Sequence, residues 1–485
     1  MSDPLAARKT HWRDNLEAIA AAIVLALLLK AFALEAYKIP TGSMQPTLMG
    51  LNTPEFSISD RIVVDKFTYA VRDPERFEVA VFRFPLDRSK NYVKRIVGMP
   101  NEQLRVQNGD LWVRPGDGDP WTVLRRPGDV QETHWKSLDD PWVAEAGPLT
   151  NDGSTLVASN SGVFRFGRRD ESITDRYFDG YLEAVRERVP TRDADGPRNT
   201  NLRQRHKVGD LKVAGDMVAE ANTFEIEVEL REGPRTYRFR VPGPAAPADA
   251  RPSIEVETES GRGLPGDAQL VAPAPERARE PWRLTAGTPT RFAVENLDDR
   301  LRLVLGDALD LTLDVPAVAS QNSAIRVRFS GPGRLAAPRV WRDVYYTARG
   351  TYEWTIPDAS YVMLGDNTQD SSDSREWTLE RFALVDTVEG RSGVLRGNKR
   401  QGENPIELET RDELFFVDEW GQRHWLAEDV GRAAADPVRE GFVEVTGLGE
   451  EPAPFVSRDM ITGRAIAVFW PIRPLAGIVR LEWIH

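Results

Sequence analysis

The sequence has no cysteine among its 485 residues, and it has only five histidines. The absence of cysteine excludes disulfide bonds, thiolate catalysis and cysteine-ligated zinc sites. None of the histidines stands in a HExxH or similar metal-ligand spacing. Metal catalysis and a Ser-His-Asp triad are therefore poorly supported, although residues far apart in sequence can still assemble a triad in space.

The sequence also lacks an excess of positive charge and has only one long apolar stretch. Its formal net charge is −12, and no basic run offsets it, so nucleic acid is not an expected partner. Charged residues make up 28% and hydrophobic residues 41% of the chain. This composition is typical of a globular protein rather than a multi-span membrane protein. The length leaves room for two or three domains.

The long apolar stretch lies near the N-terminus, over residues 18–34, and is interrupted only by Lys30. Its 17 residues are close to the shortest helix that spans a bilayer core, and flanking residues can lengthen it. Basic residues precede the stretch, whereas the 22 positions between Lys38 and Arg61 contain none. The positive-inside rule then predicts a cytoplasmic N-terminus over 1–17 and a transmembrane anchor over 18–37. We therefore expect a single-pass protein of the cell (inner or plasma) membrane, with the rest of the chain on the exported side.

Two other interpretations of this stretch remain open. An apolar run of this length is also compatible with a helix buried in a protein core. Residues 31–33 read Ala-Phe-Ala, so the stretch could also be a signal peptide that is cleaved there. Lys30 lies where the apolar region of a signal peptide is normally uninterrupted, and this favours an anchor.

A serine shortly after the apolar stretch is the first candidate nucleophile. Residues 40–48 read Pro-Thr-Gly-Ser-Met-Gln-Pro-Thr-Leu, which places Ser43 between two prolines and next to a glycine. Proline fixes φ and glycine allows unusual φ values, so this segment can hold Ser43 in a defined, exposed loop. The same composition is compatible with a simple proline-rich exit from a membrane helix, and other segments have to decide between the two.

Residues 56–99 predict consecutive β-strands. Apolar residues alternate over 77–84, and a further strand is predicted over 92–98. Lys94 and Arg95 are adjacent in that strand, so their side chains point to opposite faces of the sheet. If one of them faces water, the other faces inward.

The middle of the chain predicts a β-rich insertion. Residues 106–200 mix tryptophans with charged, turn-rich loops and predict an irregular insertion. Clear alternation follows, and 201–335 predict an antiparallel, jelly-roll-like β-sandwich. Its strands are expected at 224–230, 237–241, 291–295, 301–305, 309–313 and 325–329. Three acidic residues in this region could bind calcium but are more simply interpreted as acidic turns: Asp298, Asp299 and Asp307.

The last part of the chain returns to aromatic strands and a polar loop. Residues 365–375 follow a strand and are dense in Gly, Asp, Asn and Ser. Such a loop is normally a hydrogen-bonded turn, and the alternative is a polar platform at a site, with Asp373 and Arg375 as an ion pair. Residues 378–453 predict a second irregular, charged insertion, and 454–485 a closing strand and tail.

Four segments follow one another in a specific order. The apolar stretch precedes the serine loop, and Asp-Arg-Ile-Val-Val-Asp-Lys follows over 60–66. Tyr-Val-Lys-Arg-Ile-Val-Gly-Met-Pro stands at 92–100, and Gly-Asp-Asn opens the polar loop at 365–367. This order resembles the type I signal peptidases (leader peptidases), membrane-anchored Ser-Lys serine proteases that release exported proteins from their signal peptides. The resemblance covers about a third of the chain, in these segments: 15–105, 345–377 and 454–472.

The resemblance implies the catalytic roles. Ser43 matches the family's nucleophile, and Lys94 matches the general base, which must be neutral to accept the serine's proton. Lysine has an ordinary pKa of about 10.4, and burial against apolar side chains can lower it by roughly three units. The oxyanion is expected to be stabilised by the backbone N–H of Ser43 and by the hydroxyl of Thr41.

The resemblance also implies supporting and substrate-binding residues. Ser371 matches the residue that orients the lysine, and Asp373 and Arg375 match the ion pair that braces the loop. A shallow pocket for a small side chain is expected from Ile39, Pro40, Met44, Leu48 and Tyr92. The sequence departs from the family pattern at Thr368, Asn101, Glu102 and Glu376. None of these departures removes a catalytic group.

We therefore expect a mainly β protein, with an antiparallel signal-peptidase core, an N-terminal transmembrane helix and an inserted β-sandwich. The core is expected to comprise 38–105, 336–377 and 454–485. The resemblance implies cleavage of the signal peptides of exported preproteins after an Ala-x-Ala-type site, contact with membrane lipid, and no cofactor. Two alternatives remain: another Ser-Lys peptidase, such as a self-cleaving repressor, and a catalytically inactive membrane-tethered adhesion or carbohydrate-binding protein. The sequence identifies no ligand for either insertion.

Overall fold

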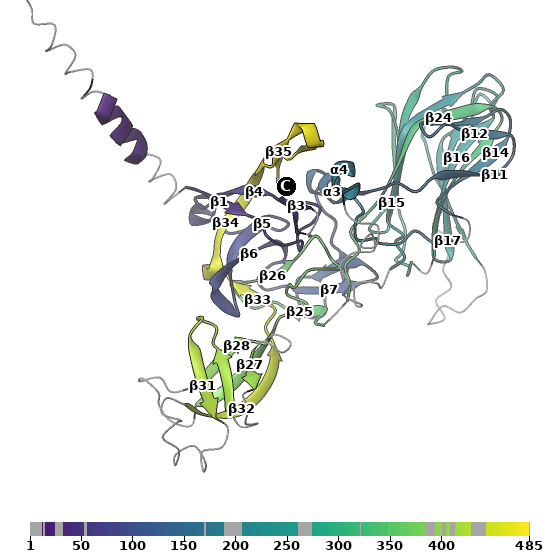
Figure 1. Cartoon of the computed structure of the whole chain (residues 1–485). Coiled ribbons are helices and arrows are strands. Elements are labelled where there is room, and N and C mark those ends of the chain that lie inside the picture. The colour runs from purple at the N-terminus through teal and green to yellow at the C-terminus, as the bar shows by residue number, and fades with distance from the viewer. Residues whose placement is uncertain are drawn as a thin grey trace, which may run out of the picture. The chain divides into compact units, whose positions relative to one another are not determined.

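A computed structural model of the chain describes most of the 485 residues. The described residues are 12, 15–24, 33–52, 56–168, 171–188, 206–259, 274–320, 322–348, 350–384, 393–399, 404–407, 413–427 and 443–484. They form two compact units (Figure 1). The first unit comprises Met1–Leu104, Arg114–Asp119 and Arg349–His485, and the second comprises Arg105–Val113 and Pro120–Ala348.

The first unit is built on a sheet in the order β1-β4-β34-β5-β6-β26-β33, with β37 also paired to β34. The strands are β1 (Leu34–Lys38), β4 (Arg61–Asp65), β5 (Val79–Phe84), β6 (Asp87–Gly98), β26 (Ser360–Leu364), β33 (Phe455–Ser457), β34 (Ile461–Trp470) and β37 (Glu482–Trp483). Smaller elements of this unit are β2 (Gly50–Asn52), β3 (Ser57–Ser59), α2 (Thr68–Val71), β25 (Glu353–Thr355), η4 (Arg458–Met460), β35 (Ile472–Arg473), η5 (Pro474–Ala476) and β36 (Ile478–Val479). Strand β7 (Gln103–Gln107) begins in this unit.

This sheet is covered on both faces. Along β5, Val79 and Val81 pack into one apolar cluster, and Ala80 and Phe82 pack into another. Side chains alternate across a strand, so the two clusters lie on opposite faces of the sheet. This explains why β5 reads as a nearly continuous apolar run and not as an alternating one.

The arrangement corrects one expectation about Lys94 and Arg95. The two side chains do alternate, but neither faces water, because Lys94 is 3% exposed and Arg95 is 0% exposed. Strand β6 lies inside the sheet, between β5 and β26. Both charges therefore need compensation within the protein.

The segment predicted as a second irregular insertion contains a sheet of its own in the order β28-β27-β32-β31-β30-β29. Its strands are β27 (Thr378–Leu384), β28 (Val394–Asn398), β29 (Ile406–Glu407), β30 (Glu413–Val417), β31 (Arg423–Ala427) and β32 (Val443–Pro452). Its small core is made of Phe382, Leu414, Phe416, Leu426 and Val445. The strands are short and charged, so their periodicity in sequence was too weak to be recognised.

The second unit contains the expected β-sandwich. One sheet has the order β12-β13-β24-β15-β20-β21-β22, with β10 paired to β24, and the other has the order β11-β14-β23-β16-β17-β18-β19. Along β21, Leu301 and Leu303 enter the core, as do Val228 and Leu230 of β16 in the other sheet. One apolar cluster therefore joins both inner faces, and all the strand pairs described between these strands are antiparallel.

The strands of the first sheet are β10 (Lys136–Leu138), β12 (Leu149–Asn151), β13 (Thr155–Ala158), β15 (Leu211–Ala219), β20 (Thr290–Leu297), β21 (Arg300–Leu305), β22 (Leu309–Asp314) and β24 (Gly333–Arg342). Those of the second are β11 (Trp142–Ala146), β14 (Gly162–Phe166), β16 (Glu225–Glu232), β17 (Arg235–Pro242), β18 (Ser253–Thr258), β19 (Glu276–Arg277) and β23 (Ser323–Ser330). The unit also contains β8 (Asp110–Arg114, up to Val113), β9 (Thr122–Val123), α3 (Gly128–His134) and α4 (Glu183–Arg186).

The boundaries of the sandwich differ from the expected ones. The segment expected to be irregular, 106–200, supplies β10 to β14. At the other end the sandwich includes β24, which was expected to open the second part of the catalytic core at 336. β24 pairs with β13 and β15, and such long-range pairing leaves no local signal in the sequence.

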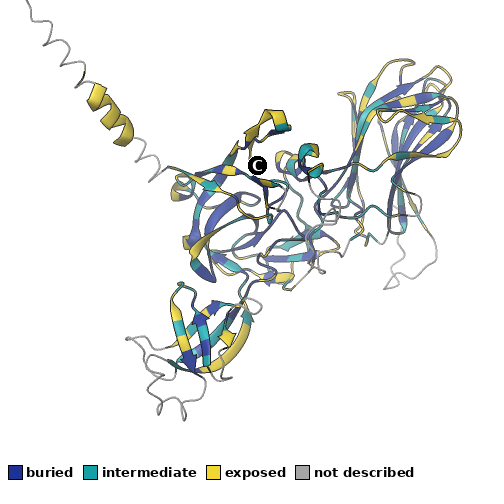
Figure 2. Ribbon diagram, viewed as in Figure 1, coloured by how far each residue is buried: buried dark blue, intermediate teal, exposed yellow. Residues whose placement is uncertain are grey.

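The predicted anchor lies partly outside the described residues. Residues 15–24 are helical with exposed apolar side chains, and 25–32 are not described (Figure 2). The last four positions of the predicted anchor, 34–37, belong to β1, which pairs with β4. Within the described part of the chain, no helix has the length and apolar character needed to cross a membrane.

Candidate active site

Ser43 and Lys94 lie in direct contact in the first unit. The Ser43 Oγ and the Lys94 Nζ are 2.5 Å apart and hydrogen-bonded. Ser43 lies in the loop that leaves β1, and Lys94 projects from β6. Two residues that are 51 positions apart thus form a serine–lysine pair, an arrangement in which a neutral amine can activate a hydroxyl.

The environment of Lys94 favours its neutral form. Burial is the largest influence and lowers the pKa of Lys94 from 10.5 to about 8. The carboxylate of Asp373 opposes this shift, and the guanidinium of Arg375 adds to it. A lysine with a pKa near 8 is partly neutral under mildly alkaline conditions and can accept a proton there.

The polar loop 365–375 is hydrogen-bonded to the serine loop. The backbone N–H of Asn367 donates to the Ser43 carbonyl at 3.2 Å. The Asn367 side-chain amide donates to the Gly42 carbonyl at 3.0 Å. One asparagine therefore fixes the backbone carbonyls of both Gly42 and Ser43. The sequence predicted that Asn367 lies in the polar loop but predicted no role for it.

Two glycines allow this close packing. A Cβ atom at Gly365 would lie 2.3 Å from the Ser43 carbonyl oxygen and 2.1 Å from the Ser371 Oγ. A Cβ atom at Gly50 would lie 2.2 Å from the Thr41 carbonyl oxygen. Neither position has room for a side chain unless the backbone of the serine loop moves.

A buried ion pair between Arg95 and Asp366 joins β6 to the same loop. The Arg95 Nε and Nη2 donate to the two carboxylate oxygens of Asp366 at 2.9 and 2.8 Å. Thr47 of the serine loop donates its hydroxyl to Asp366 at 2.6 Å. The sequence did not predict this ion pair, although Asp366 stands in the Gly-Asp-Asn motif and Arg95 is next to Lys94.

A second buried pair reaches the serine loop from the C-terminal end. Arg480 donates to Asp60 at 2.9 Å and to the Thr47 carbonyl at 2.8 Å. Asp60 in turn accepts from the backbone N–H of Met49 at 2.7 Å. No pattern in the sequence connected residues 60 and 480.

Asp373 and Arg375 form the expected ion pair, with Nη2 and Oδ2 at 2.7 Å. Burial raises the pKa of Asp373, but the charge of Arg375 and its hydrogen bonds outweigh this, so the pKa ends below its ordinary value. Asp373 also accepts from the N–H of Gly365 at 3.0 Å. Ser371, expected to orient Lys94, is buried, and its Oγ has no hydrogen-bond partner among the described residues.

The donors expected for an oxyanion are available. Neither the backbone N–H of Ser43 nor the Thr41 hydroxyl has a hydrogen-bond partner within the described part of the chain. Both residues line a cavity of about 460 Å³ beside the dyad. A carbonyl oxygen that enters this cavity can therefore meet donors that are not already engaged.

Four of the five expected substrate-binding residues line this cavity: Ile39, Pro40, Met44 and Tyr92. Leu48 does not, because it is fully buried and packs in the core with Ile62 and Val64. Other residues that line the cavity are Tyr37, Lys38, Asn91, Val93, Asp370 and Ser372. The only group of carboxylates in the described residues with metal-ligand spacing lies in the second unit.

Comparison with known proteins places part of the chain in a family. Residues 12–182 match the family described as signal peptidase, peptidase S26. A probable signal peptidase I-2 from Synechocystis sp. is 37% identical over 173 residues, which are 34% of this chain and 66% of that protein. Signal peptidase I from Pseudomonas fluorescens is 38% identical over 95 residues, 17% of this chain and 31% of that protein. The chain thus spans less than two thirds of the length of these relatives.

One solved structure aligns over a larger part of the chain. The carbohydrate binding module CBM66 from Bacillus subtilis is 10% identical, covers 41% of this chain and 94% of its own, and gives a TM-score of 0.25. A TM-score this low gives no information about function. The match to the family, in contrast, spans residues 12–182, which include Ser43 and Lys94, and through this segment the chain belongs to the signal peptidase family, peptidase S26.

Proposed function

We propose that the protein is a membrane-bound endopeptidase that removes N-terminal signal peptides from exported preproteins after an Ala-x-Ala-type site. Ser43 is the nucleophile and Lys94 the general base. The observation that carries this proposal is the 2.5 Å contact between Ser43 Oγ and Lys94 Nζ, with the lysine buried. Membership of the signal peptidase family supports the substrate class.

The proposed reaction proceeds through an acyl-enzyme. Ser43 Oγ attacks the scissile carbonyl carbon while its proton passes to the neutral Nζ of Lys94. The oxyanion that forms is stabilised by the Ser43 N–H and the Thr41 hydroxyl. When the C–N bond breaks, Lys94 returns the proton to the leaving amine. Lys94 then takes a proton from water, whose oxygen attacks the ester, and the serine regains its proton as the acid product leaves.

Substrate binding is proposed to extend the sheet. The register of β26 on β6 begins at Arg95, so 91–94 have no strand partner on that side in the described part of the chain. An extended peptide can pair with this edge and place alternate side chains into the cavity. The cavity is lined by Ile39, Met44 and Tyr92, which leaves room for small side chains such as alanine.

The proposed location is the exported face of the cell membrane, with the N-terminus in the cytoplasm. Besides the apolar N-terminal stretch, the C-terminal segment of the first unit exposes Trp470, Ile472, Leu475 and Trp483. Trp470 pairs with Arg61 and Arg61 with Lys38, so this apolar surface lies at the end of the sheet from which the serine loop leaves. Exposed tryptophans and aliphatic side chains suit a lipid interface.

The test is cleavage of a secretory precursor with an Ala-x-Ala site by the full chain in detergent. Ser43→Ala and Lys94→Met are expected to abolish cleavage, and the wild type to cut after the second alanine. Lys90→Met is the matched control, because Lys90 lies on the same strand and is half-exposed. Equal behaviour of all four proteins would overturn the proposal and leave a membrane-tethered binding protein as the better description.

A further inference from the structure

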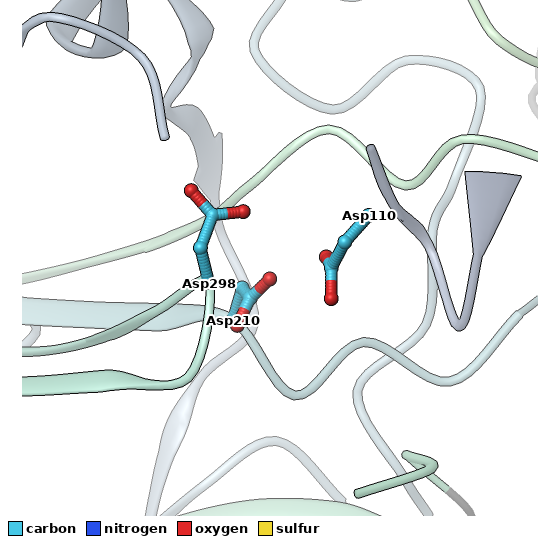
Figure 3. A group of neighbouring side chains, drawn as sticks. All are labelled: Asp110, Asp210 and Asp298. Carbon is cyan, nitrogen blue, oxygen red and sulfur yellow. The ribbon is translucent and has the colours of Figure 1, made fainter. Parts of the chain in front are cut away.

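Three aspartates from separate segments of the second unit meet at one point. Asp110 opens β8, Asp210 directly precedes β15, and Asp298 lies in the turn between β20 and β21. Each contributes a carboxylate oxygen, and these oxygens lie within 4.8 Å of one another. Figure 3 shows the three carboxylates directed toward a common space.

Among the described residues, no side chain forms a salt bridge with these carboxylates, and no donor hydrogen-bonds to them. Asp298 is the most buried of them, with 3% exposure, and its Oδ2 has no hydrogen-bond partner there. In the part of the chain that the structure describes, the hydrogen bond that Arg125 donates to Asp298 goes to its backbone carbonyl, at 2.8 Å, and not to its carboxylate. A buried carboxylate oxygen without a partner is costly, and one that points at two further carboxylates is more so.

Two other acids nearby show how the protein supplies a carboxylate with its own hydrogen-bond donors. Asp343 accepts hydrogen bonds from Arg126 and Gln131, both at 2.8 Å. Glu232 accepts from three donors, Tyr237 at 2.9 Å, Asn296 at 2.9 Å and Ser320 at 2.7 Å. Among the described residues, the carboxylates of Asp110, Asp210 and Asp298 thus lack the hydrogen-bond donors that Asp343 and Glu232 have.

The surrounding charges make the deficit larger. Burial, followed by the neighbouring carboxylates, raises the pKa of Asp110 and Asp210 well above the ordinary value. Burial raises the pKa of Asp298 to about 7, although Arg126 and Arg125 oppose the shift. Three further acids also raise the pKa of Asp110: Asp299, Glu232 and Asp343. One further basic residue, Arg235, lowers the pKa of Asp299. The three converging carboxylates thus form a concentration of negative charge that a cation would balance.

We propose that Asp110, Asp210 and Asp298 bind a calcium ion. Calcium takes oxygen ligands at 2.3–2.6 Å, so oxygens on opposite sides of one ion lie up to about 5 Å apart, which matches the observed spacing. The group offers only oxygen, which excludes the softer metals that prefer nitrogen or sulfur. Magnesium demands closer, octahedral ligands and usually keeps several waters, so calcium fits better. The ion would tie together three segments that are about 90 residues apart or more in sequence.

The experiment uses the full chain in detergent, stripped with EDTA and then titrated with CaCl₂ by calorimetry, with MgCl₂ in parallel. Thermal unfolding is recorded with EDTA and with calcium. We expect one calcium per chain and a higher unfolding temperature with calcium. The double variant Asp210→Asn, Asp298→Asn is expected to lose at least roughly ten-fold in affinity. Asp307→Asn, an exposed acid of the same sandwich, is the matched control and is expected to behave as wild type.

The pH dependence separates the ion from its alternative, a group that shares protons. A carboxyl whose pKa is raised by folding stabilises the fold when protonated and loses that contribution as the pH rises through the folded pKa. In EDTA, the contribution of Asp298 to the unfolding temperature should therefore fall as the pH rises from about 4 to about 7, and calcium should restore stability at pH 7 and above. Absence of calcium binding by the wild type at pH 8, or tighter binding of magnesium, would overturn the proposal.

Discussion

At the scale of single residues, Lys94 lies in a buried position, where a charged lysine side chain lowers the stability of the fold. Lys94 is almost fully buried, and its one hydrogen bond from Nζ in the described residues goes to Ser43. The penalty for burying the ammonium is the same effect that makes the amine a usable base. The proposed catalytic role of Lys94 and its local cost in stability therefore have one physical origin.

The first prediction concerns the pH profile of cleavage. If Lys94 acts as a neutral base, kcat/KM rises with pH and levels off above the lysine pKa of about 8. Asp373→Asn removes a carboxylate that favours the ammonium, so the midpoint should move to lower pH. The measurement is kcat/KM between pH 6 and pH 10 for both proteins, over the range that brackets that pKa. A flat profile for the wild type would rule out Lys94 as the titrating base.

The second prediction concerns stability at the same residue. Folding lowers the pKa of Lys94, so the cost of burying it is greatest below the folded pKa and decreases as the pH rises from about 8 toward 10.5. Lys94→Met should therefore stabilise the first unit at pH 7, by at most ~3 kcal/mol for a shift of this size. Chemical denaturation at pH 7 and at pH 10 checks this: the gain should shrink at the higher pH. A destabilised Met variant at pH 7 would contradict the argument.

The third prediction concerns Gly365. A methyl group there collides with the Ser43 carbonyl and the Ser371 hydroxyl, so Gly365→Ala should displace the nucleophile. We expect at least a roughly hundred-fold loss of kcat/KM, because misplacement by about 1 Å has that effect. Gly128→Ala serves as the control, since a Cβ atom there meets no atom within 4 Å. Full activity of Gly365→Ala would mean that the serine loop is not held as described.

At the scale of elements, β6 carries two functions on its two faces. Lys94 faces the cavity, and Arg95 faces Asp366 on the other side of the strand. Because both faces are covered, the strand cannot slip by one residue without exchanging the base and the arginine. The polar loop 365–375 meets this strand through Asp366 and meets the serine loop through Asn367, so it couples the two halves of the dyad.

The fourth prediction compares a buried ion pair with an exposed one. Asp366→Asn leaves Arg95 buried without its counter-charge, and we expect a loss of about 3–5 kcal/mol in the free energy of unfolding. Asp73→Asn breaks the pair with Arg458, but Asp73 is 82% exposed, so the loss should be below about 1 kcal/mol. Urea denaturation of the three proteins provides the values. Equal losses for the two variants would show that burial does not govern the first pair.

At the scale of the whole molecule, the two units have separate cores. Phe82 belongs to a cluster formed only by residues of the first unit, and Phe329 to a cluster formed only by residues of the second. The expected dyad lies entirely in the first unit, and the acidic group lies entirely in the second. Activity and calcium binding should therefore respond to different mutations.

The fifth prediction follows from these separate cores. Calorimetry of the full chain should resolve two unfolding transitions. Phe82→Ala and Phe329→Ala should each destabilise one unit by about 3–5 kcal/mol, and each should shift a different transition. Only Phe82→Ala should lower the temperature at which cleavage is lost. A single transition that both variants shift equally would contradict the division.

Several features were accessible from the sequence. Alternating apolar residues predicted β16, β17 and β21, and apolar, β-branched runs predicted β5 and β6, because a half-buried or buried strand leaves a local pattern. The pairing of β13 and β24 was not accessible, because nothing in either segment specifies a partner almost 180 residues away. Leu48 was expected in the pocket because of the family resemblance, but its side chain packs into the core.

The sequence by itself determined the apolar N-terminal stretch and the mainly β character, because both are written in local composition and order. Its resemblance to the signal peptidases pointed to Ser43 and Lys94 as the proposed dyad. The tertiary structure decided what surrounds them. It paired Arg95 with Asp366, brought Arg480 to Asp60, and gathered Asp110, Asp210 and Asp298 from three segments. Burial of charge is a property of the folded chain, since the same side chains are fully hydrated when the chain is extended. The lowered pKa of Lys94 and the predicted affinity for calcium both arise at that level.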